Sequence, residues 1–143
     1  MNSNHCTHQT DYGPNPYVAN IEQLGIENNN FRTAIWTGCN LQMTLMCISP
    51  CGEIGLEIHP ATDQFIRIEQ GTARVTMGSC KNHPDYQQTM CKGDAVFIPA
   101  GTWHNIVNLE RQPLKVSVIY APPNHKRGTI HRTKKDAESE DYK

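Results

Sequence analysis

The residues G-D-A-V-F-I-P-A-G-T-W-H-N-I-V-N, from Gly93 to Asn108, decide the fold of this chain. Pro99 and Gly101 predict a tight turn in the middle of the stretch, because proline fixes φ and glycine accepts a positive φ. The apolar residues on both sides are typical of short strands. His104 begins the second extended segment, so its imidazole is a candidate metal ligand.

A second stretch, G-E-I-G-L-E-I-H-P-A-T-D-Q-F-I-R-I-E-Q-G from Gly52 to Gly71, supplies further candidate ligands. Glu57 and His59 are two residues apart, so on a strand both side chains point to one face. A solvated strand face would give the same alternation. Gln64 follows five residues after His59. Because a borderline divalent metal accepts carboxylate, imidazole and amide groups, we expect Glu57, His59, Gln64 and His104 to form a metal site.

The Gly93–Asn108 stretch resembles the second sequence motif of the cupin family at every position that defines the motif. These positions are Gly93, Pro99, Gly101, His104 and Asn108, separated by five, one, two and three residues. The resemblance covers about residues 36–121. It implies an all-β fold consisting of a single cupin (jelly-roll) β-barrel.

The Gly52–Gly71 stretch resembles the first cupin motif in spacing but differs from it in two residues. That motif usually reads His-x-His, then Glu, then Gly, whereas here Glu57 stands at the first His position and Gln64 at the Glu position. The set of candidate ligands therefore still contains one carboxylate, as the usual motif does, but it stands at the position of the first histidine. Cupins include isomerases, dioxygenases, decarboxylases, lyases, storage proteins and sugar-binding regulator domains, so the fold does not specify a reaction.

The rest of the chain has the pattern of a β protein, whatever family it resembles. Short apolar or alternating segments are separated by turn residues, and hardly any segment has a helical period, which favours a closed or double-sheet β architecture. We expect strands over residues 17–21, 31–37, 41–48, 65–69, 72–77, 95–98, 103–108 and 114–120, and a turn-rich excursion over 78–92.

We expect an N-terminal arm (residues 1–30), the cupin barrel (31–121) and a C-terminal tail (122–143). Asn20 with Gln23, and Thr133 with Asp136, have the spacing of helix caps and predict two short helices. Residues 1–16 are expected to be a mobile end, and the tail is expected to be solvated. Alternatively, the basic residues of the tail could meet an anionic substrate at the barrel mouth.

Composition excludes several classes of partner and site. A net charge of −1 over 143 residues gives no electrostatic reason to expect nucleic acid or a membrane surface. No apolar run approaches the roughly 20 residues of a membrane span, and no secretion signal is visible, so we expect a cytoplasmic protein. Six cysteines without a C-x-x-C pair predict neither a zinc site nor a structural disulfide.

Exposed strand edges predict a homodimer that pairs through residues near 17–21.

The expected metal site leaves open positions for a small-molecule substrate. A set of two imidazoles and one carboxylate suits iron, manganese, zinc or nickel. Gln64 would either bind the ion itself or contact a residue that binds it. One reaction class is isomerisation of a sugar or sugar phosphate, as in the small cupins likened to mannose-6-phosphate isomerase that this chain resembles. An iron-dependent dioxygenase and a small-molecule-binding protein without turnover are the alternatives.

Two further expectations concern the surroundings of the site. Gln42, Thr44 and Arg67 are expected to bind substrate hydroxyls if their strand faces point inward. Without a metal, the ligand-like residues would instead form a hydrogen-bonded polar core. The sequence assigns no catalytic residue.

Overall fold

A computed structural model describes residues 11–140. Its helices are α1 (Ile21–Glu27) and α2 (Lys134–Glu140). Its strands are β1 (Arg32–Thr37), β2 (Gln42–Ile48), β3 (Asp63–Gln70), β4 (Thr72–Gly78), β5 (Tyr86–Cys91), β6 (Ala95–Ile98), β7 (Trp103–Asn108), β8 (Leu114–Ala121) and β9 (Ile130–His131). In this part of the chain, no helix is both long and apolar enough to cross a bilayer.

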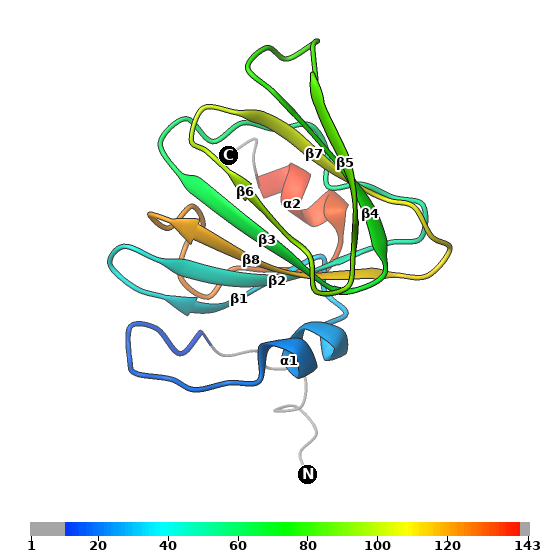
Figure 1. Cartoon of the computed structure of the whole chain (residues 1–143). Coiled ribbons are helices and arrows are strands. Elements are labelled where there is room, and N and C mark those ends of the chain that lie inside the picture. The colour runs from blue at the N-terminus through cyan, green and yellow to red at the C-terminus, as the bar shows by residue number, and fades with distance from the viewer. Residues whose placement is uncertain (1–10, 141–143) are drawn as a thin grey trace.

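The strands form two antiparallel sheets (Figure 1). One has the order β6-β3-β8-β2-β1-β9, and the other has the order β5-β4-β7. The predicted all-β jelly roll is therefore confirmed, although the strands form two facing sheets and not one closed barrel. Helix α1 lies on the outer side of the six-stranded sheet, while α2 lies between the two sheets in this view.

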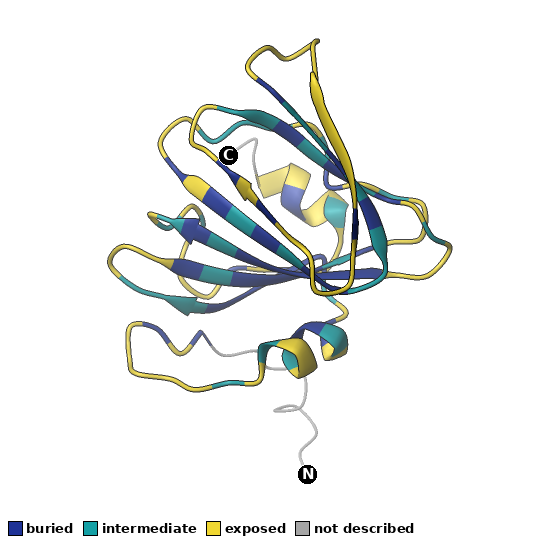
Figure 2. Ribbon diagram, viewed as in Figure 1, coloured by how far each residue is buried: buried dark blue, intermediate teal, exposed yellow. Residues whose placement is uncertain are grey.

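The core fills the space between the sheets, because alternate residues of each strand point inward. On β2, Met46 lies opposite Val116 of β8, and Ile48 lies opposite Leu114, so all four share the inner face. Each is at most 1% exposed. Figure 2 shows this pattern as buried residues along the middle of both sheets. Burying one such side chain contributes about 1.5–3 kcal/mol, so this inner face supplies much of the stability of the fold.

The strands expected from residue 31 onward are confirmed, each within two residues of its expected bounds, except for the one around Glu57 and His59. Strand β5 lies inside the segment expected to be an excursion. It went unpredicted because only Met90 among its residues is buried, which leaves no alternating pattern. The strand expected over residues 17–21 is wrong. Asn20 instead caps α1, accepting a hydrogen bond from the Gln23 backbone N–H at 3.0 Å.

Both predicted helix caps are confirmed. Besides the Asn20 cap of α1, the Thr133 hydroxyl accepts from the Asp136 N–H at 3.1 Å, and Asp136 Oδ2 accepts from the Thr133 N–H at 3.2 Å. This reciprocal pair is a capping box and fixes the start of α2.

Part of the C-terminal tail packs against the rest of the fold, although most of its described residues are exposed as expected. Strand β9 pairs with β1, which extends the six-stranded sheet by one strand. Ala137 of α2 joins the hydrophobic core, and His131 is only 4% exposed. A two-residue strand and a single core alanine give no periodic signal, so the sequence pattern could not reveal this packing.

The N-terminal arm is also held in place where the structure describes it. Asp11 accepts hydrogen bonds from the Thr37 hydroxyl at 2.6 Å and from the Gly128 N–H at 2.9 Å. The Lys115 ammonium, on the outer face of β8, donates to Asn29 Oδ1 at 2.9 Å. The expectation of a mobile end is therefore wrong for residues 11–16. Residues 1–10 lie outside the described range.

Five cysteines belong to the described residues, and all five are free thiols. They are Cys39, Cys47, Cys51, Cys80 and Cys91. Cys6, with the neighbouring His5 and His8, falls in the range that the structure does not describe.

The homodimer stays a prediction. Of the residues expected to pair, Tyr17, Val18, Ala19 and Ile21 line an apolar groove with Trp36 and Met43, and Val18 is 96% exposed. If this surface joins two copies, multi-angle light scattering at micromolar concentration should give twice the chain mass of 16.1 kDa. Val18→Asp should lower that mass, because burying an unpaired carboxylate is costly. A wild-type mass equal to that of one chain would end the dimer hypothesis.

Candidate metal centre

A backbone pairing brings the two predicted ligand segments together. Glu57 lies on the segment between β2 and β3, and His104 lies on β7. The Glu57 N–H donates to the His104 carbonyl at 3.0 Å, and the His104 N–H donates to the Glu57 carbonyl at 2.9 Å. Residues that exchange both hydrogen bonds in this way lie directly opposite each other, so their side chains leave the backbone on the same side. The segment makes only isolated bridges here, and the strand expected for Glu57 and His59 is not regular.

The turn predicted from Pro99 and Gly101 positions the other imidazole. Gly101 has a φ of +79°, which favours glycine, and its N–H donates to the His59 carbonyl at 2.9 Å. The turn between β6 and β7 therefore anchors the backbone of His59 beside the pair formed by Glu57 and His104.

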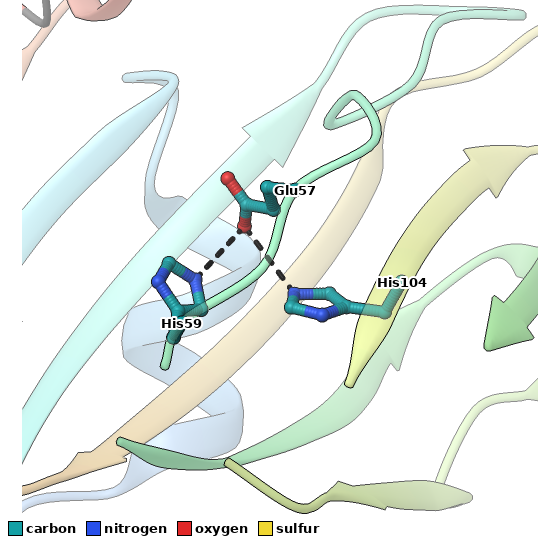
Figure 3. A group of neighbouring side chains, drawn as sticks. All are labelled: Glu57, His59 and His104. Atoms are coloured by element: carbon teal, nitrogen blue, oxygen red, sulfur yellow. Dashed lines mark hydrogen bonds and ion pairs between the residues drawn. The ribbon is translucent and has the colours of Figure 1, made fainter. Parts of the chain in front are cut away.

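Glu57, His59 and His104 converge on one point (Figure 3). Glu57 Oε1 lies 3.2 Å from His59 Nε2 and 3.5 Å from His104 Nε2, and the ligand atoms of all three residues lie within 4.8 Å of one another. Ligands that bind one ion at about 2.0–2.2 Å are at most about 4.4 Å apart. Small side-chain movements would therefore let all three bind one ion.

The hydrogen bonding of His104 fits a metal ligand. Its Nδ1 lies 3.0 Å from the Thr102 carbonyl, which can only accept, so Nδ1 carries a proton. Nε2 is buried and lies at ion-pair distance from Glu57 Oε1, but it makes no hydrogen bond to any of residues 11–140. An imidazole whose Nδ1–H is held by a carbonyl while Nε2 is left free is the arrangement of metal-binding histidines. A fully hydrogen-bonded polar core would not leave this atom unpaired.

Glu57 supplies the negative charge of the group. Burial alone would raise the pKa of this carboxyl, but the imidazoles of His104 and His59 outweigh burial and hold the pKa well below its usual range. Glu57 is therefore a carboxylate at neutral pH, which is the form that binds a cation.

Gln64, the fourth predicted ligand, faces the interior close to this group. On β3 it lies opposite Tyr120 of β8, whose ring meets the His59 ring edge-on at 5.8 Å. Gln64 is 4% exposed, and its Oε1 accepts no hydrogen bond within the described chain. An unpaired buried amide oxygen is consistent with a ligand. The residue is not one of the three converging side chains, so its role as a ligand stays a prediction.

The family model of the cupin domain matches residues 44–120, more than half of the chain. This chain belongs to the cupin family. It is 54% identical over 127 residues to protein YrkC of Bacillus subtilis (strain 168), across 89% of this chain and 68% of YrkC. Protein L612 of Acanthamoeba polyphaga mimivirus is 40% identical over 115 residues, across 80% of this chain and 70% of L612.

A solved structure supports the same assignment. The crystal structure of BH2720 from Bacillus halodurans superposes with a TM-score of 0.90 at 49% identity, across 91% of this chain and 98% of BH2720. The names of these three proteins state no activity. The comparisons therefore confirm the expected family and a small single-domain cupin, and leave its reaction to be inferred from the site.

Two residues of the candidate metal group of this cupin, Glu57 and His59, line a cavity of about 770 Å³. The lining residues are Arg32, Glu57, Ile58, His59, Asn124, His125, Lys126 and Glu140. Half of them come from the C-terminal segment beyond residue 121. The sequence offered this wall only as the alternative in which the basic residues of the tail lie at the barrel mouth, and it did not point to Arg32, Asn124 or Glu140.

The three polar residues expected to bind substrate have different roles. Gln42 faces inward but holds the cavity wall, because its Oε1 accepts from the His125 N–H at 2.9 Å and its Nε2 donates to the His125 carbonyl at 2.8 Å. Thr44 also faces inward. The expectation for Arg67 is wrong, since its guanidinium lies on the outer face and donates to Glu69 at 2.7 and 3.0 Å.

His125 is an uncharged member of the cavity wall. Burial lowers its pKa to about 3, and the positive charge of Arg32 adds to this effect. Its Nε2 lies 3.3 Å from the Tyr120 hydroxyl. At neutral pH, His125 is therefore a neutral hydrogen-bonding group.

Replacing His104 by alanine should weaken binding of manganese or zinc by about 100-fold or more, because two remaining ligands hold a borderline ion poorly. Titration calorimetry on metal-free protein measures this change. His83→Ala is the matched control, since His83 is exposed on the loop between β4 and β5 and should bind metal as the wild type does. Equal affinities for His104→Ala and the wild type would contradict the proposed ligand set.

The low pKa of His125 predicts a stability loss in mild acid. The unfolded chain takes up a proton at about pH 6.5, whereas the folded chain does so only near pH 3, so stability falls as the pH drops below 6.5. Between pH 7 and pH 5, the metal-free wild type should lose about 2 kcal/mol more than His125→Asn. Urea unfolding at both pH values measures the difference, and equal losses would disprove a buried, neutral His125.

Proposed function

We propose that this cupin is a metal-dependent enzyme that acts on a small polar molecule, with isomerase-like chemistry on a sugar or sugar phosphate. One observation carries the proposal, namely that two members of the converging group, Glu57 and His59, line a large polar cavity. A metal ligand set at the wall of such a cavity can meet a substrate directly. The metal would be divalent iron, manganese, zinc or nickel.

Two histidines and one carboxylate leave a bound divalent ion with excess positive charge and open positions, from which it would polarise a substrate carbonyl or hydroxyl oxygen. The protein fixes this geometry before substrate arrives. The Thr102 carbonyl orients the His104 ring, and the Gly101 N–H holds the backbone of His59. Preorganisation of this kind lowers the cost of reaching the reactive arrangement.

The cavity wall has the polar groups that a hydroxylated substrate requires. Asn124 and the neutral His125 can donate and accept hydrogen bonds, and Gln42 holds the backbone of both residues in place. Isomerisation also needs a group that takes a proton and returns it. The Glu140 carboxylate is the candidate on the cavity wall that is not part of the proposed ligand set, since a pKa of about 3 makes the His125 imidazole a poor proton acceptor.

Iron-dependent oxygenation is the second candidate function. It is favoured by the ligand set itself, because two histidines and one carboxylate with open positions are typical of ferrous oxygenases. Binding of a small molecule without turnover is the third, since a polar cavity does not by itself require a reaction.

Anaerobic turnover separates these functions. Protein loaded with manganese or zinc should interconvert members of a panel of aldoses, ketoses and their phosphates, and His104→Ala should lose this activity while His83→Ala keeps it. Activity that appears only with ferrous iron and consumes oxygen would refute the isomerase and support the oxygenase. Substrate binding without product under either condition would support the binding protein.

A further inference from the structure

A buried arginine faces the same cavity as the candidate metal group. Arg32 begins β1, on the inner face opposite Met46, and is 5% exposed. Its guanidinium carbon lies 5.2 Å from the centre of the Phe31 ring, which limits its movement. Arg32 also lines the cavity together with Glu57 and His59. A guanidinium is therefore fixed on the wall that a substrate at the metal would meet.

The hydrogen bonds of Arg32 leave its charge uncompensated. Its Nη1 lies 3.1 Å from His131 Nδ1, and because arginine can only donate, Nδ1 must be the acceptor. His131 then carries its proton on Nε2 and donates to Glu140 Oε1 at 2.9 Å. The neutral imidazole thus separates Arg32 from the Glu140 carboxylate and orients its guanidinium.

In the part of the chain that the structure describes, no carboxylate lies within ion-pair distance of Arg32, and its Nε has no hydrogen-bond partner. A buried charge without a counter-ion is costly, and proteins normally pair it. The cavity wall holds two cations, Arg32 and Lys126, and two anions, Glu57 and Glu140. A divalent cation on Glu57 would leave this wall with an excess of positive charge.

We propose that Arg32 is the centre of an oxyanion subsite that binds a carboxylate or phosphate group of the substrate. The inference rests on the proposed function only in assigning the anion to a substrate. Arginine suits this role because its planar fork donates two parallel hydrogen bonds to a carboxylate or phosphate. The exposed Lys126 at the rim adds positive potential that attracts such an anion.

Binding of simple anions to metal-free protein tests the subsite without reference to turnover or metal. Calorimetric titrations with inorganic phosphate and with malonate, at constant ionic strength set by chloride, show which oxyanion the subsite takes. At least one should bind saturably to the wild type, and Arg32→Met should weaken it about 10- to 100-fold. Arg111→Met is the control, because Arg111 is exposed in the loop at the opposite end of β8 from Tyr120. The absence of saturable binding to the wild type, or equal binding by Arg32→Met, would overturn the proposal.

A measurement on the wild type covers the case in which Arg32→Met does not fold. In ¹H–¹⁵N spectra, the Nε–H signal of Arg32 should move as the bound anion is added. The Nε–H of Arg127 already donates to the Gly13 carbonyl at 2.7 Å and should stay in place. An unmoved Arg32 signal at saturating phosphate and malonate would refute the subsite, even if metal-dependent turnover were found.

Discussion

The two backbone hydrogen bonds between Glu57 and His104 are the contact on which the candidate site depends. They join an irregular segment, whose backbone pairs with β7 through isolated bridges, to a regular strand of the three-stranded sheet. Because the pair lies directly opposite, the carboxylate and the imidazole face each other, and His59, two residues further on, completes the group. The sheet thus fixes a ligand set that the local conformation of the segment alone would not maintain.

The C-terminal segment turns this ligand set into a site with a cavity. Gln42 of β2 binds the backbone of residues 124 and 125, and β9 pairs with β1. The segment is therefore held against the six-stranded sheet at the edge formed by β1. It supplies His125, Lys126 and Glu140 to the cavity wall. The candidate metal ligands and the substrate contacts proposed on the C-terminal segment therefore come from separate parts of the chain, so substrate preference could change without altering the candidate metal group.

The fold and the convergence of Glu57, His59 and His104 could be predicted because the two sequence motifs have the spacing of the cupin motifs, which bring these positions together in space. The turn at Gly101 and the spacing before His104 need only a few neighbouring residues to specify them. The cavity wall could not be predicted in the same way. In the sequence, Arg32 is one residue of an ordinary predicted strand, and nothing marks it as part of a site. It lies on a cavity wall only because the tail folds back over the sheet. The outward direction of Arg67 follows from the inward direction of Gln64, because residues three apart on one strand point to opposite faces.

Elemental analysis of protein purified without added metal tests the central claim of this account most directly. If Glu57, His59 and His104 bind a metal, the wild type should retain close to one equivalent of iron, manganese, zinc or nickel per chain, and Glu57→Ala should retain almost none. Because His5 and His8 could bind metal adventitiously, a variant with alanine at both positions serves as the control and should keep its metal. A wild type without metal that also fails to take up any of these four ions when they are supplied would contradict the account.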